Sequence, residues 1–131
     1  MIGEAPYAEG FGDRHYPILP YEDIIAIETL RPLVDKLIVV MVTGRPLLIE
    51  NELPLIDALA VAWLPGQAGE GVADGLFGRQ PFTGRLPVPW PLKSEQLPFK
   101  SGSRTADRTP PLYPLGYGLN TSLLTVNENR Q

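Results

Sequence analysis

The sequence has no cysteine, a single histidine and no long hydrophobic run. Without cysteine the chain has no disulfide, thiolate metal site or cysteine nucleophile. One imidazole, that of His15, is too few for a zinc site built from several histidines. No stretch approaches the roughly 18 apolar residues that a membrane span requires. The first residues also lack the basic and then apolar pattern of a signal peptide. We therefore predict no bound metal and no association with a membrane.

The charge balance is acidic, with 11 Lys and Arg against 15 Asp and Glu. This balance disfavours nucleic acid as a partner, because phosphate binding needs a basic face. Apolar residues make up 44% of the 131 residues, which is enough for one modest domain with its own core. Fifteen prolines and thirteen glycines cluster in residues 3–20, 78–91 and 98–118. Aromatic and aliphatic residues are interleaved with them, which predicts long ordered loops.

Three segments have features of helices. Residues 21–35 carry isoleucines at helical spacing behind an acidic first turn. Pro32 is unfavourable inside a helix, so we expect it to open a second short helix over residues 32–35. Residues 53–56 are expected to form a short helical turn. Residues 69–76 place Val and Leu on one side and are followed by glycine, which predicts another helix.

Two apolar segments predict buried strands. Residues 37–42 are a continuous β-branched run without alternation, which is typical of a strand covered on both faces in a parallel sheet. An extended run resumes at residues 47–49. Residues 58–64 are ambiguous by period, but their short length and the Pro-Gly that ends them favour a strand. Residues 85–88 are interpreted as an edge strand, where proline is tolerated. Strands alternating with helices predict an α/β fold with a right-handed parallel sheet.

Several short motifs follow one another in a fixed order, and together they resemble a known family. The run AWLPG is followed by GVADGLFG and FTGRLP, and the chain begins with GEAPYAEGFGD, continues with VTGRPL and later reads PLGYGL. This order, from Gly3 to about Leu119, resembles the C-terminal α/β domain of glycoside hydrolase family 3, the β-glucosidases and exo-β-glucanases. Gln67 and Ala68 stand where the family commonly has Ser or Thr followed by Glu, which points to branches other than the exo-glucanase form.

The resemblance implies a partial parallel α/β sandwich with long Pro- and Gly-rich loops over residues 1–126, followed by a frayed tail at 127–131. It also implies a missing partner, because family enzymes carry a barrel domain with an aspartate nucleophile before this domain. No aspartate of this chain lies in a motif like that nucleophile strand; the candidates considered are Asp35, Asp57, Asp74 and Asp107. We therefore expect a fragment or truncated product of a larger enzyme, periplasmic or secreted, that is itself inactive.

The resemblance also implies a catalytic residue. Retaining glycosidases need two carboxyl groups about 5 Å apart, one as nucleophile and one as acid/base. By the motif of residues 3–13, Glu9 is the acid/base, with Glu4 as the competing candidate and a substrate-binding residue. Tyr7 is expected to bind substrate by stacking or hydrogen bonding. The implied reaction is hydrolysis of terminal β-D-glucosyl units of β-glucosides or β-glucans, without metal or cofactor.

Other polar and aromatic residues have plainer interpretations. Arg45 follows a buried strand, and a salt bridge to a carboxylate of the domain is favoured over anion binding. His15 is interpreted as a surface loop residue rather than a general base. Trp63 ends an apolar run, which favours a core or interface role over a sugar-stacking platform. Trp90 lies in a proline-rich loop and is interpreted as part of a partner surface.

A second functional hypothesis remains open from the sequence. A chain with one of two catalytic carboxyl groups could be a non-catalytic module that binds glucan or self-associates into a homo-oligomer to cover an exposed sheet edge. Nucleotide binding at Gly66 to Gly71 is disfavoured, because the Lys and Ser/Thr of a phosphate-binding loop are missing. An esterase is also disfavoured, because no Gly-x-Ser-x-Gly motif is present.

Overall fold

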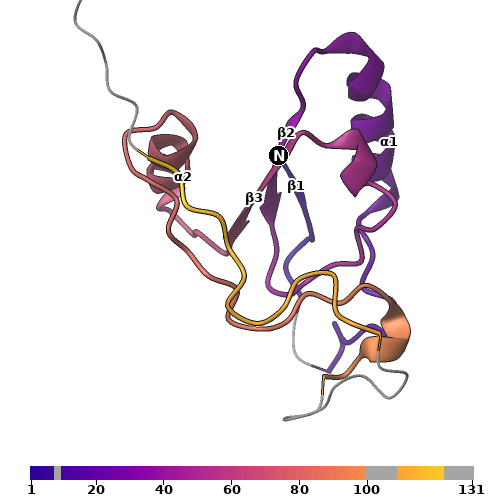
Figure 1. The fold of residues 1–131 in the computed structure, drawn as a ribbon. Helices are drawn as coiled ribbons and strands as arrows, with labels where there is room; N and C mark the ends of the chain where they lie inside the picture. Colours follow the sequence, from indigo (N-terminus) through magenta and orange to yellow (C-terminus); the bar gives the residue numbers. More distant parts are fainter. Residues whose placement is uncertain (8–9, 100–108, 123–131) are drawn as a thin grey trace, which may run out of the picture.

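The computed structural model describes residues 1–7, 10–99 and 109–122 and contains a parallel three-stranded sheet (Figure 1). The strand order is β1 (Ile2–Gly3), β2 (Ile38–Val42) and β3 (Ala58–Trp63). The β-branched run of β2 lies in the centre, where Val39, Val40 and Met41 are buried. Successive side chains of a strand point to opposite faces, and here both faces are covered, which explains the unbroken apolar sequence. The predicted α/β class with a parallel sheet is confirmed.

Helix α1 (Tyr21–Leu30) connects β1 to β2, and α2 (Gly69–Leu76) follows β3. The two helices lie on opposite sides of the strands (Figure 1). Three 3₁₀ turns complete the regular structure of the described residues, at Arg31–Leu33, Leu53–Leu55 and Ser94–Gln96. The predicted break near Pro32 is confirmed, since α1 ends at Leu30 and the next turn is 3₁₀. Among the described residues, no helix is long and apolar enough to cross a bilayer.

The core lies between α1, the sheet and the loops that leave its strands. Its buried members are Ile2, Leu19, Ile27, Leu37, Val39, Met41, Leu47, Ile49 and Trp90. The prediction for Trp90 was wrong, because its side chain is 1% exposed rather than part of a partner surface. Its indole Nε1–H donates to the carbonyl of Leu47 at 2.7 Å. Satisfying that one donor lets the large apolar ring fill the core without a polar penalty.

The predicted edge strand at residues 85–88 was also wrong. This segment instead pairs irregularly with the segment that ends the described chain, and the two run side by side (Figure 1). Leu86 N–H donates to Tyr117 at 2.9 Å, Gly116 N–H donates back to Leu86 at 2.9 Å, and an isolated antiparallel bridge joins Trp90 to Tyr113. Pro87 has no N–H to donate, so a continuous ladder does not form.

Candidate functional site

The carboxyl ends of the three parallel strands meet at one edge of the sheet. From this edge leave the loops that follow Gly3, Val42 and Trp63. Open α/β sheets bind their ligands outside this edge, because the loops there converge on one place. The first loop contains every residue that the sequence proposes for catalysis or substrate binding. The second loop contains Arg45.

Arg45 forms the predicted salt bridge, and its partner is Glu4. The guanidinium Nη2 lies 2.7 Å from Glu4 Oε1, and Nε lies 3.0 Å from Oε2. The Thr43 hydroxyl lies 3.2 Å from the same carboxylate and shares its single hydrogen between Glu4 Oε2 and the nearer carbonyl of Arg45. The Glu4 side chain is only 5% exposed. A buried carboxylate with this fork of donors is held in one orientation.

The same guanidinium makes two more contacts with the first loop. Its Nη1 donates to the carbonyl of Gly12 at 2.8 Å, and its carbon lies 4.3 Å from the centre of the Tyr7 ring. The hydrogen bond to Glu4, opposed in part by burial, raises the pKa of Arg45 above its ordinary value. Gly44 leaves room for this stack, since a Cβ there would lie 2.7 Å from the Tyr7 hydroxyl. Tyr7 and Glu4 are therefore brought together at Arg45.

Glu9, the predicted acid/base, lies outside the described residues. The chain that follows it turns back sharply, because Asp13 N–H donates to the carbonyl of Gly10 at 3.3 Å and Gly10 has a φ of 78°. A positive φ of this kind is readily adopted by glycine. Between them, Phe11 is 99% exposed. The described part of the loop is thus a pinned turn with an apolar side chain at its tip.

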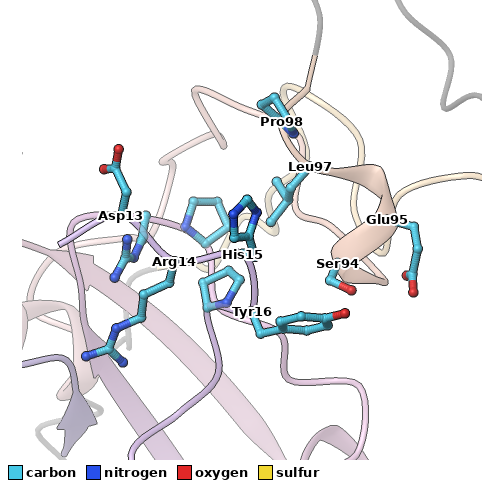
Figure 2. A pocket seen from close by; sticks show the side chains of 11 residues that line it. Asp13, Arg14, His15, Tyr16, Ser94, Glu95, Leu97 and Pro98 are labelled. Carbon is cyan, nitrogen blue, oxygen red and sulfur yellow. The ribbon is translucent and has the colours of Figure 1, made fainter. Parts of the chain in front are cut away.

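A cavity of about 600 Å³ lies beside this loop (Figure 2). It is lined by Asp13, Arg14, His15, Tyr16, Pro17, Arg45, Pro46, Ser94, Glu95, Leu97 and Pro98. Figure 2 shows the imidazole of His15 next to Leu97, and the Tyr16 ring near Ser94. Sequence reasoning missed the contribution of residues 94–98, because no motif marks them and they approach only through tertiary folding.

Two other interpretations from the sequence concern chemistry at this edge. Trp63 packs against the core, with its ring centroid 6.2 Å from that of Trp90, as favoured over a sugar platform. Among residues 1–7, 10–99 and 109–122, no group of three or more His, Cys, Asp or Glu side chains is arranged to hold a metal ion. The described part of the site therefore offers carboxylate, guanidinium, phenol and imidazole groups.

Comparison with known proteins identifies the family. Residues 1–121 match the model of the glycosyl hydrolase family 3 C-terminal domain. The chain belongs to this family. It is 31% identical to a periplasmic β-glucosidase of Salmonella typhimurium, in an alignment covering 98% of this chain and 19% of that protein. It is 34% identical to a xylan 1,4-β-xylosidase of Xylanibacter ruminicola, covering 92% of this chain and 15% of the relative.

The fold of this family 3 domain is also found in solved structures. A β-glucosidase of Listeria innocua superposes with a TM-score of 0.76 at 26% identity, covering 90% of this chain and 19% of that one. Structures of a Listeria innocua β-glucosidase in complex with isofagomine and with glucose match as well. The chain thus spans less than a fifth of the length of these relatives.

Proposed function

We propose that this chain is the C-terminal portion of a retaining β-glucosidase or exo-β-glucanase and that it supplies the acid/base residue, Glu9, to a barrel domain. The observation that carries the proposal is the place of the loop of residues 3–13. This chain belongs to family 3. Its loop leaves the carboxyl end of β1 and is joined to the loop after β2 by the hydrogen bond from Arg45 to Gly12. Residues at this edge of an α/β sheet are well placed to reach a ligand.

The proposed roles follow from the chemistry of retaining hydrolysis. The nucleophile of the barrel domain attacks the anomeric carbon, while the Glu9 carboxylic acid gives its proton to the departing glycosidic oxygen. The Glu9 carboxylate then removes a proton from water, which attacks the glycosyl-enzyme and regenerates the barrel carboxylate. Tyr7 is proposed to contact the sugar. For Glu4 the substrate-binding role stays a prediction, and its pairing with Arg45 supports a role in holding the loop.

The proposed substrate is a terminal β-D-glucosyl unit of a β-glucoside or β-glucan. This choice is supported by relatives and structural neighbours whose names are β-glucosidases. The β-xylosidases among the relatives make β-xylosides the matched comparison substrates, since xylose differs from glucose only by lacking the hydroxymethyl group. A non-catalytic glucan-binding or self-associating module is the second candidate. It is supported by apolar side chains left exposed, such as Phe11, Leu64 and Phe77.

The deciding experiment measures β-glucosidase activity of the free chain and of a hybrid enzyme. In the hybrid, this chain replaces the aligned segment of the Salmonella periplasmic β-glucosidase. We expect no turnover by the free chain, because one carboxyl group of the pair is missing. In the hybrid, Glu9→Gln should lower kcat/KM for alkyl β-glucosides by about 10²–10⁴-fold, the usual contribution of general acid–base catalysis.

The loss should depend on the leaving group. A dinitrophenolate departs without a proton, so formation of the glycosyl-enzyme from a dinitrophenyl β-glucoside should survive Glu9→Gln. Azide should then accelerate turnover of the variant, since it attacks the intermediate without a general base. Glu70→Gln, in the exposed first turn of α2, is the matched control and should leave the rates unchanged. Glu9-dependent turnover by the free chain would contradict the requirement for a barrel. An equal loss for all leaving groups would contradict the role of Glu9.

A further inference from the structure

One side chain, Arg45, holds the first loop on both sides of residue 9. Towards the start of the loop it binds the Glu4 carboxylate through Nε and Nη2, and its guanidinium lies over the Tyr7 ring. Past residue 9 it donates from Nη1 to the carbonyl of Gly12 at 2.8 Å. The planar guanidinium therefore uses all three of its nitrogens and one of its faces on a single loop.

Arg45 is itself fixed to the sheet. Thr43, which is fully buried at the end of β2, accepts a hydrogen bond from Arg45 N–H at 3.2 Å and donates its hydroxyl to the Arg45 carbonyl at 2.7 Å. Glu4 N–H also donates to the carbonyl of Val42 at 3.2 Å. We call the contacts of Arg45 with Glu4, Tyr7 and Gly12 the clamp. The clamp is thus attached to β2, the central and most deeply buried strand of the sheet.

We propose that Arg45 is a positioning residue for catalysis, because it holds the loop that carries Glu9 at Glu4 and Tyr7, before that residue, and at Gly12, after it. This inference rests on the proposed function, in which Glu9 is the acid/base. It assigns Glu4 to the clamp, because its oxygens are occupied by Arg45 and Thr43. The proposal also explains why residue 44 is glycine, because a Cβ there would lie 2.7 Å from the Tyr7 hydroxyl.

The physical need for such a clamp comes from the loop itself. Gly10 and Gly12 flank Phe11, and glycine has the largest conformational freedom to lose when a loop is ordered. A general acid must lie within hydrogen-bond reach of the oxygen that it protonates, and a misplacement of about 1 Å costs about 10²-fold in rate. Contacts on both sides of Glu9 restrict the loop more than a contact on one side.

The test uses the hybrid enzyme and two variants that spare the fold. Arg45→Lys keeps the charge but loses the fork, and the double variant Arg45→Met with Glu4→Gln removes both charges, so neither leaves an unpaired buried carboxylate. If Arg45 positions the acid, both variants should lower kcat/KM for alkyl β-glucosides by about 10²-fold while sparing kcat/KM for the dinitrophenyl β-glucoside, because kcat/KM reports formation of the glycosyl-enzyme. Arg79→Lys is the matched control, because its ion pair with Asp74 is exposed and lies at the end of α2.

A second measurement needs no activity. In the free 131-residue chain, amide hydrogen exchange at Glu4 and Asp13 should accelerate in both variants, while exchange in β2 stays unchanged. An equal loss of kcat/KM for all leaving groups, or unchanged exchange in the loop, would overturn the clamp. If Glu9→Gln shows no leaving-group dependence, the proposed function fails instead, and the exchange result alone decides whether Arg45 holds the loop.

Discussion

Glu52 is a carboxylic acid in an unfavourable place for a charge. It directly precedes the 3₁₀ turn Leu53–Leu55 and is 8% exposed. Burial raises the pKa of its carboxyl group above the ordinary value, its own backbone N–H lowers it in part, and the nearby charge of Glu28 raises it further. Water stabilises a carboxylate far better than this site does, so the group is more easily protonated in the folded protein than in the unfolded chain.

This shift gives Glu52 a defined effect on stability against pH. A carboxyl group whose pKa is raised by folding favours the folded state below the unfolded pKa of about 4.3 and loses that contribution as pH rises through the folded pKa. Glu52→Gln should therefore stabilise the chain at pH 7, by less than about 1 kcal/mol. The gain should vanish at pH 3. Urea unfolding at both pH values measures it, with exposed Glu50→Gln as the control. A loss of stability at pH 7 would contradict the assignment.

At the scale of elements, Asp57 joins the helix layer to the sheet. It directly precedes β3 and accepts hydrogen bonds from Leu37 N–H at 2.7 Å, just before β2, and from Lys36 Nζ at 3.1 Å. Arg31, at the start of the 3₁₀ turn after α1, forms an ion pair with it. The backbone hydrogen bond, with help from both cations, holds the pKa of Asp57 well below its usual range.

We expect Asp57→Asn to lower the Tm at pH 7. A carboxylate whose pKa is lowered by folding contributes stability above its unfolded pKa of about 3.9 and loses it as pH falls through the folded pKa. The difference from the wild type should therefore shrink as the pH is taken progressively below 3.9. Thermal unfolding followed by circular dichroism measures this, with exposed Asp35→Asn as the control. A Tm difference that is independent of pH would show that the lost contact is not electrostatic.

The whole molecule leaves much apolar surface exposed. Within the described residues, most of the large side chains that are more than 60% exposed lie outside the helices and strands; they are Met1, Phe11, Tyr16, Tyr21, Leu33, Leu64, Phe77, Leu115 and Leu119. The outer strands β1 and β3 each pair on one side only in the described sheet. Exposed strand edges and apolar patches of this kind are sites of association.

The free chain is therefore predicted to be oligomeric at micromolar concentration. Multi-angle light scattering gives its mass directly. Replacing Leu64 and Phe77 with lysine should lower that mass, because charged side chains oppose burial of these positions in an interface. Glu70→Gln serves as a control that leaves the apolar surface intact. A monomer at micromolar concentration would contradict this prediction.

Local sequence determined several of the regular elements, although not the strand predicted at residues 85–88. The unbroken apolar run of residues 37–42 contains β2 (Ile38–Val42), the run of residues 58–64 contains β3 (Ala58–Trp63), and residues 69–76 form α2. Hydrophobic period, proline and glycine act within a few residues, so these signals are readable without the fold. The order of short motifs likewise identified the family, which the match over residues 1–121 confirms.

Contacts between distant residues were decided only by the tertiary structure. Trp90 was predicted at the surface because its neighbours are prolines. In the structure its side chain is buried, and its indole N–H donates a hydrogen bond to the carbonyl of Leu47, 43 residues away. The sequence favoured a salt bridge for Arg45, and the fold chose Glu4, 41 residues away, and brought Tyr7 and Gly12 to the same guanidinium. Such partners are selected by packing and by the need to satisfy buried polar groups, neither of which leaves a local pattern.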